Sequence, residues 1–157
     1  MQQHDNKIKE VQFPNAIILP EIIKLINDGH SVTLQLKGYS MRPFLENNRD
    51  KALLTKPTKF EVGDPVLAEI RDGVYVLHRI IKIDKINDIV TLRGDGNFAT
   101  ETCKQDNIKA LAIGFYRKGR KTLDRIDGRK WKLYSFLWTH LFPIRRYLLF
   151  IYRKLFV

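Results

Sequence analysis

The sequence contains a single cysteine, Cys103, so no disulfide can form within the chain. We expect Cys103 to be an ordinary surface residue rather than a reactive thiol. No stretch reaches the roughly 18 consecutive apolar residues that a membrane-spanning helix needs. The first ten residues are polar and mixed in charge, without the apolar run of a secretory signal. These absences predict a cytoplasmic protein that stays on the side of the membrane where it is made.

The sequence also lacks the spacings that metal and phosphate sites require. Its histidines (His4, His30, His78 and His140) are scattered, and no cysteine or carboxylate stands at ligand spacing from them. There is no glycine-rich loop of the kind that holds phosphates. The sequence therefore predicts neither a metal nor a cofactor.

Acidic residues are missing from the last part of the chain. The whole sequence has 28 Lys and Arg against 17 Asp and Glu, a net charge of +11, yet residues 128–157 contain seven basic residues and no acid. Such an imbalance favours an anionic partner. We expect a folded domain over residues 1–127, followed by a basic, aromatic tail over residues 128–157.

Alternating apolar and polar residues predict strands through most of the first part. Ser31–Leu36 has period two, and Asp72-Gly73 is a hairpin turn between two apolar runs. A helix is expected over residues 20–28, with Pro20 in its first turn and Gly29 after its end. With so few helices, the fold class is mainly β, an antiparallel coiled sheet or partly open barrel. The predicted strands are 31–36, 51–54, 66–70, 74–83, 89–92 and 108–116.

One short stretch, Lys37-Gly38-Tyr39-Ser40-Met41-Arg42-Pro43, presents a serine between a glycine and a proline directly after a predicted strand. Gly38 allows the backbone to turn without a Cβ clash, and Pro43 stops the strand from continuing. Ser40 should therefore lie on a tight, exposed turn. Serine, glycine and proline are also common in turns that have no chemistry, so the stretch alone leaves both interpretations open.

Two later segments supply the partners that a nucleophilic serine needs. His78, in a strand-like run, has an ordinary pKa near neutrality and can accept the proton of the serine hydroxyl. Lys82, four residues on, is the alternative base on the same expected face. Arg79 should face away, because neighbouring strand residues point to opposite sides of a sheet. Asp95 lies on the glycine-rich turn Gly94-Asp95-Gly96-Asn97, where it is either an orienting acid or a turn-former.

Taken in order over residues 36–97, the Ser40 turn, the His78-Arg79 pair and the Arg93-Gly94-Asp95 turn resemble the signal peptidase I and LexA-like serine peptidase superfamily. They are most similar to the archaeal and eukaryotic type of signal peptidase, in which histidine precedes the arginine. The resemblance implies Ser40 as nucleophile, His78 as base and Asp95 as the acid that orients His78. Glu101 falls where related sequences often carry a second acid. The sequence differs from this family at two points. Arg49 stands where the family has a turn glycine, and the N-terminal membrane anchor expected of a signal peptidase is missing.

The resemblance predicts a serine endopeptidase that cleaves a peptide, protein or leader segment with a Ser-His dyad. One alternative is a catalytically silent peptide-binding module on the same fold. Another is a self-cleaving regulator, which the lack of a DNA-binding helix pair before residue 31 disfavours. Nucleic acid is accordingly an unlikely partner.

Residues 129–157 interleave aromatic and aliphatic residues with Arg and Lys, which predicts two short helices broken near Pro143. This composition suits a helix that lies in the interface of an anionic membrane, peripheral on the cytoplasmic face. The alternatives are a tail packed over the edge of the sheet, an oligomer interface, or a contact with a partner protein or nucleic acid.

Overall fold

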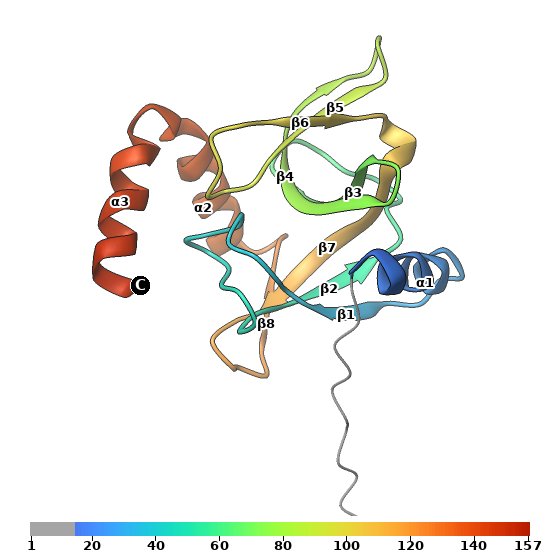
Figure 1. Cartoon of the computed structure of the whole chain (residues 1–157), viewed down its shortest axis with the longest axis horizontal. Coiled ribbons are helices and arrows are strands. Elements are labelled where there is room, and N and C mark those ends of the chain that lie inside the picture. The colour runs from blue at the N-terminus through green and yellow to red at the C-terminus, as the bar shows by residue number, and fades with distance from the viewer. Residues whose placement is uncertain (1–14) are drawn as a thin grey trace, which may run out of the picture.

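A single antiparallel sheet organises the part of the chain that the computed structural model describes, residues 15–157. Along the sheet the strand order is β1-β2-β7-β3-β4-β5-β6, and β8 pairs with β7. The sheet curls into a half barrel (Figure 1), which confirms the mainly β, coiled antiparallel fold. The strands are β1 Val32–Gln35, β2 Lys51–Thr55, β3 Pro65–Arg71, β4 Val74–Asp84, β5 Ile89–Arg93, β6 Glu101–Cys103, β7 Ile108–Tyr116 and β8 Leu123–Arg125.

All of the predicted strands form, with ends within a residue or two of those expected. The β3–β4 hairpin turns at Asp72-Gly73, where Gly73 has a φ of 70°. The two short strands β6 and β8 were not predicted, because three residues are too few to show an alternating pattern. A one-turn 3₁₀ helix, η1 Gln105–Asn107, leads into β7.

Helix α1 (Asn15–Asn27) begins earlier than expected. Pro20 lies inside it rather than in the first turn, so that part of the prediction is wrong. The apolar positions Leu19, Ile22 and Ile26 are all buried, and their spacing extends the inward face of the helix to residues before Pro20. Burial of Leu19 therefore favours helix on both sides of the proline. The helix ends as predicted at Gly29, which has a φ of 95°.

Two apolar clusters fill the curled sheet. The larger cluster joins α1, the residues after β1, and strands β2 and β7, and it includes Phe44, Phe115 and Trp131. The smaller cluster lies between β3, β4 and β5 and contains Cys103. Cys103 is thus buried rather than at the surface as expected, and burial raises the pKa of its thiol, which disfavours the reactive thiolate.

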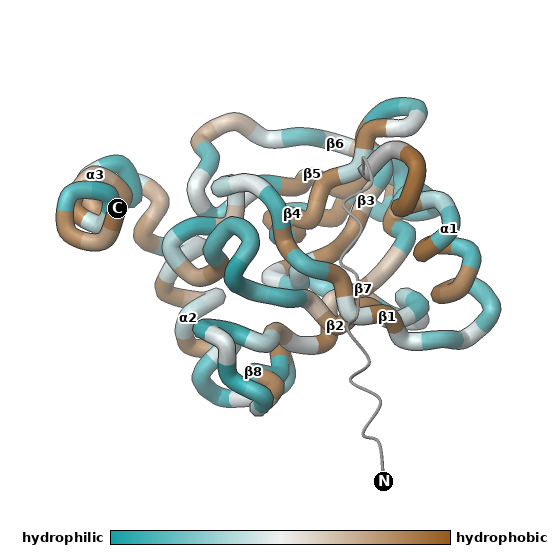
Figure 2. Tube along the Cα trace, turned by 60° about the horizontal axis from the view of Figure 1, so that its bottom comes forward, coloured by the Kyte–Doolittle hydropathy of each residue, from teal (hydrophilic) through white to brown (hydrophobic). Residues whose placement is uncertain are grey.

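The C-terminal segment forms helix α2 (Arg129–His140), the short 3₁₀ turn η2 (Phe142–Ile144) and helix α3 (Arg145–Phe156). The break falls at Pro143, as predicted. Helix α2 packs on the sheet through Trp131, whereas α3 stands apart at the same end of the molecule (Figures 1 and 2). Over the described range, none of the helices has the length and apolar content to cross a bilayer.

Candidate active site

The Ser40 turn follows β1 and is held by backbone contacts at both ends. Gly38 has a φ of 90°, which a residue with a Cβ rarely adopts, and its N–H donates to Asn47 Oδ1 at 2.8 Å. The carbonyl of Ser40 accepts a hydrogen bond from the N–H of Gly96 at 2.7 Å. The turn is therefore fixed between its own loop and the glycine-rich turn after β5. Among the described residues the N–H of Ser40 has no backbone acceptor.

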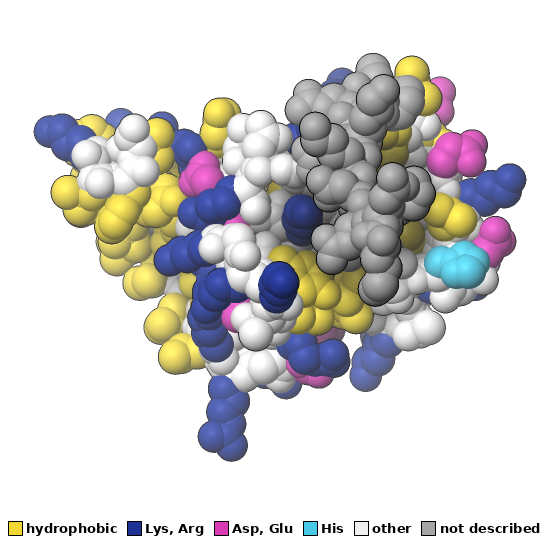
Figure 3. Space-filling model, turned by 90° about the horizontal axis from the view of Figure 1, so that it is seen from below, with side chains coloured by type: hydrophobic (Ala, Val, Ile, Leu, Met, Phe, Trp, Pro, Cys, Tyr) yellow, Lys and Arg dark blue, Asp and Glu magenta, His cyan; other side chains and the backbone are white. Residues whose placement is uncertain are grey.

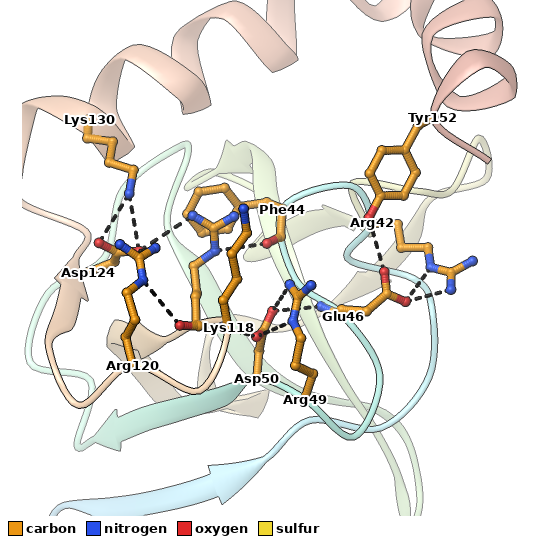
Figure 4. Close-up of polar contacts among 11 residues, drawn as sticks. Arg42, Phe44, Glu46, Arg49, Asp50, Lys118, Arg120, Asp124, Lys130 and Tyr152 are labelled. Carbon is orange, nitrogen blue, oxygen red and sulfur yellow. Dashed lines mark hydrogen bonds and ion pairs between the residues drawn. The ribbon is translucent and has the colours of Figure 1, made fainter. Parts of the chain in front are cut away.

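Asp50 fixes the far end of the same loop (Figure 4). It is fully buried and accepts hydrogen bonds from the N–H groups of Glu46 and Lys118 and from the guanidinium of Arg49. Burial raises the pKa of Asp50, but these donors outweigh it and hold the pKa below its ordinary value. The ionised carboxylate thus stabilises the loop that contains Asn48-Arg49-Asp50.

His78 lies on β4 and is only 3% exposed. Its Nδ1 lies 3.0 Å from Glu101 Oε2. Glu101 reaches it through the sheet register, because β5 pairs with β4 on one side and with β6 on the other. A carboxylate only accepts hydrogen bonds, so this contact places the hydrogen on Nδ1 and leaves the lone pair on Nε2. Glu101 is the acid that orients His78 in this structure.

The environment keeps the imidazole neutral near pH 7. Burial lowers the pKa of His78 below its ordinary value of 6.5, while the charge and hydrogen bond of Glu101 act in the opposite direction. A neutral imidazole with a free Nε2 is the form that accepts a proton from a hydroxyl. The ring is therefore in the state that a general base requires.

Gly94 allows His78 and the Ser40 turn to approach each other. A Cβ at position 94 would lie 3.0 Å from His78 Nε2 and would collide with the carbonyl oxygen of Ser40. His78 Nε2 and the carbonyl oxygen of Ser40 therefore both lie against Gly94. Ser40 and His78 line one cavity of about 150 Å³, although across the described residues their side chains are not hydrogen-bonded to each other. Such contacts are often long without substrate and tighten when it binds.

Asp95, the acid expected to orient His78, instead binds Arg79 on the other side of β4. Arg79 Nε and Nη2 donate to the two carboxylate oxygens of Asp95, each at 2.8 Å. Arg79 Nη1 also donates to the carbonyl of Gly63 at 2.9 Å and to Ser135 Oγ at 2.6 Å. Arg79 thus faces away from Ser40, as predicted.

Side chains of helix α2 cover the Arg79–Asp95 pair. Tyr134 OH donates to Asp95 Oδ2 at 3.1 Å, and Trp138 Nε1 donates to the Asp95 carbonyl at 3.0 Å. The Arg79 guanidinium stacks over Trp131, with 4.7 Å from Cζ to the ring centroid. Sequence reasoning missed this role of α2. The sequence contained a signal for this packing, because one face of the helix carries Trp131, Tyr134, Ser135 and Trp138.

Lys82, the alternative base, does not reach the cavity. The β4–β5 register shifts between Ile80 and Lys82, so the alternation that placed Lys82 on the face of His78 is interrupted there. Lys82 is exposed to solvent. Its ammonium group is consequently not a neighbour of Ser40.

No cluster of three or more His, Cys, Asp or Glu side chains in residues 15–157 is arranged to hold a metal ion. The site consists of a hydroxyl, a neutral imidazole and a carboxylate. That set transfers protons and provides an oxygen nucleophile.

Comparisons with protein-family models, curated proteins and solved structures find no match to this chain. The likeness to signal peptidases consequently depends on the residues of the Ser40 turn, the His78-Arg79 pair and the Gly94-Asp95 turn.

Proposed function

We propose that this chain is a serine endopeptidase of the signal peptidase-like type, with Ser40 as nucleophile and His78 as general base. The observation that carries the proposal is the shared cavity, which Ser40 and His78 line together. Nε2 of a neutral His78 and the Ser40 carbonyl also lie against the same residue, Gly94. Glu101, on the other ring nitrogen, takes the orienting role that was expected of Asp95.

The reaction follows from these positions. Ser40 Oγ attacks the carbonyl carbon of the scissile bond while His78 Nε2 takes its proton, and Glu101 stabilises the imidazolium that results. The Ser40 N–H is the first candidate donor to the oxyanion. His78 then gives the proton to the leaving amine, and an acyl group remains on Ser40. Water attacks this ester with His78 again as base, which releases the acid and restores the hydroxyl.

The substrate is an extended peptide. Strand β1 ends the strand order, and among residues 15–157 its one pairing partner is β2, so we place the added peptide strand at its other edge. The cavity walls combine β1 residues with Met41, Leu67 and Leu77, which provide an apolar surface beside the nucleophile. A peptide that pairs with β1 would thus place an apolar side chain next to Ser40.

Incubation of the full chain with a mixture of peptides, followed by mass spectrometry, tests this function. We expect cleavage at defined bonds, and its loss in both Ser40→Ala and His78→Ala. Cleavage that continues unchanged in both variants would refute the assignment. Retention of peptides without cleavage would instead identify a binding module, and a fall in the intact mass of the chain incubated alone would identify self-cleavage.

A further inference from the structure

Among residues 15–157, one side of helix α3 packs against the rest of the protein and the other side is exposed. Arg145, Leu149 and Tyr152, at positions i, i+4 and i+7, face the body of the protein. Arg145 and Leu149 are buried, and Arg145 Nη2 donates to the carbonyl of Trp138 at 3.1 Å. Tyr152 OH donates to Glu46 at 3.1 Å (Figure 4). These contacts fix which side of α3 faces outward.

The outward side is apolar and exposed. Phe150 is 61% exposed and Leu155 is 70% exposed, and Tyr147 and Ile151 are exposed on the same turns. Figure 3 shows hydrophobic side chains gathered at this end of the molecule. An apolar surface of this kind on a folded protein marks a contact with a partner or a membrane.

Basic residues border the apolar surface. A hollow is lined by the aromatic residues Phe98, Tyr147 and Phe150 together with Arg146, Arg153 and Lys154. Over residues 128–157 there is no acid to offset these charges. Aromatic rings beside long basic side chains match the boundary of an anionic bilayer, where rings lie at headgroup depth and the cations meet phosphates.

A second copy of the chain fits this surface poorly. A two-fold interface would bring the same basic residues of both copies together, and each chain already has a net charge of +11. An anionic lipid surface offers the opposite charge. With 12 residues, α3 has a length of about 18 Å, which suits a helix lying along the interface.

We propose that the outward face of α3 docks on an anionic phospholipid bilayer, with Tyr147, Phe150, Ile151 and Leu155 in contact with the acyl boundary and Arg146, Arg153 and Lys154 at the phosphates. The proposal does not depend on peptide cleavage. It concerns a different surface, and vesicle binding is measured without a peptide substrate.

Cosedimentation of the full chain with vesicles tests the docking. We expect binding to phosphatidylcholine vesicles that contain phosphatidylglycerol, weaker binding to phosphatidylcholine alone, and a decrease as salt screens the headgroups. The double variant Phe150→Ser/Leu155→Ser should bind about a hundredfold more weakly, because its apolar side chains no longer leave water. The inward contacts of α3 are unchanged in this variant, and circular dichroism checks that it is folded.

Ile86→Ser is the matched control, because Ile86 is an apolar side chain, 96% exposed, in the β4–β5 turn. It should bind like the original chain. A second variant, Arg146→Gln/Lys154→Gln, keeps the apolar residues and should bind about 25-fold more weakly at low salt.

Three results would overturn the proposal. The first is no sedimentation of the original chain with anionic vesicles. The second is equal binding by the original chain and both α3 variants. The third is self-association that the double variant abolishes while vesicle binding is unchanged, which would assign the surface to a second copy.

Discussion

His78 and Arg79 are neighbours on β4, and both are buried, at 3% and 1% exposure, yet they face opposite sides of the sheet. Arg79 is enclosed: Asp95, the Gly63 carbonyl and Ser135 accept its hydrogen bonds, and α2 covers it. His78 has Nδ1 on Glu101, and its side chain lines a cavity that Ser40 also lines.

The difference shows that burial alone does not identify a reactive group. A buried polar side chain with every donor satisfied holds the fold together, because removing its partners leaves uncompensated charge. One with a position left open to a cavity can exchange a proton with a ligand. We therefore assign a structural role to the Arg79 side of β4, and our proposal assigns the chemistry to the His78 side.

The largest difference between the two faces of β4 is expected for His78→Gln. This substitution keeps much of the side-chain volume and a donor for Glu101 but removes the base. We expect kcat/KM for peptide cleavage to fall by about 10⁴-fold, since serine is a weak nucleophile without a base. The free energy of unfolding should change by less than about 1 kcal/mol. Peptide kinetics and urea denaturation measure the two quantities. A large loss of stability with little loss of rate would reverse the roles of the two faces.

On the other face, Arg79→Leu should lower the free energy of unfolding by about 3–5 kcal/mol, because Asp95 is left buried without its cation. The double variant Arg79→Leu/Asp95→Leu should be less destabilised than the sum of the two single variants, because it removes both charges together. Urea denaturation of all three gives the coupling. A destabilisation below about 1 kcal/mol for Arg79→Leu would contradict a structural role for the pair.

Glu101→Gln tests which acid orients His78. The rate should fall by about 100-fold, because Gln does not stabilise the imidazolium through a charge. Since Glu101 raises the pKa of His78, its loss should move the acid limb of the pH–rate profile to lower pH. A shift of that limb in Asp95→Asn, with none in Glu101→Gln, would return the orienting role to Asp95.

The smallest expected effect is an acid-dependent loss of stability. The pKa of folded His78 lies below the ordinary 6.5, so the unfolded chain binds a proton that the folded chain does not. The free energy of unfolding is therefore unaffected by the titration of His78 above pH 6.5. It decreases as the pH falls from 6.5 toward the folded pKa, with a slope of at most about 1.4 kcal/mol per pH unit. Urea denaturation of the original chain and of His78→Gln should show the slope only in the original chain. Parallel curves would show that His78 does not titrate in this way.

Sequence patterns predicted the six longer strands and singled out Ser40 and His78, which both line the cavity. The alternation in Ser31–Leu36 predicted β1, and the Gly38 turn placed Ser40 after it. The orienting acid was not decided by the sequence, since Asp95 and Glu101 both follow His78 in the chain and either could fold back to it. The β4–β5–β6 register decides it, and register depends on contacts across the sheet rather than on spacing.

The C-terminal segment shows a second limit of sequence reasoning. Both helices of residues 129–157 are basic and rich in aromatic residues, yet α2 packs against the sheet and α3 presents an apolar face to solvent. The difference arises because Trp131 meets Phe44 and Phe115 in the core, a contact between segments far apart in the chain. Composition of the segment alone does not contain this information.

The division between the two faces is tested most directly by the initial rate of peptide cleavage in Ser40→Ala and Tyr134→Phe, measured below the unfolding temperature of both. Tyr134→Phe removes one hydrogen bond to Asp95, worth about 1 kcal/mol of stability, and touches nothing at the cavity. We predict that Tyr134→Phe cleaves at the rate of the original chain and that Ser40→Ala does not cleave. Equal rates in the two variants would contradict the assignment of the chemistry to the His78 face.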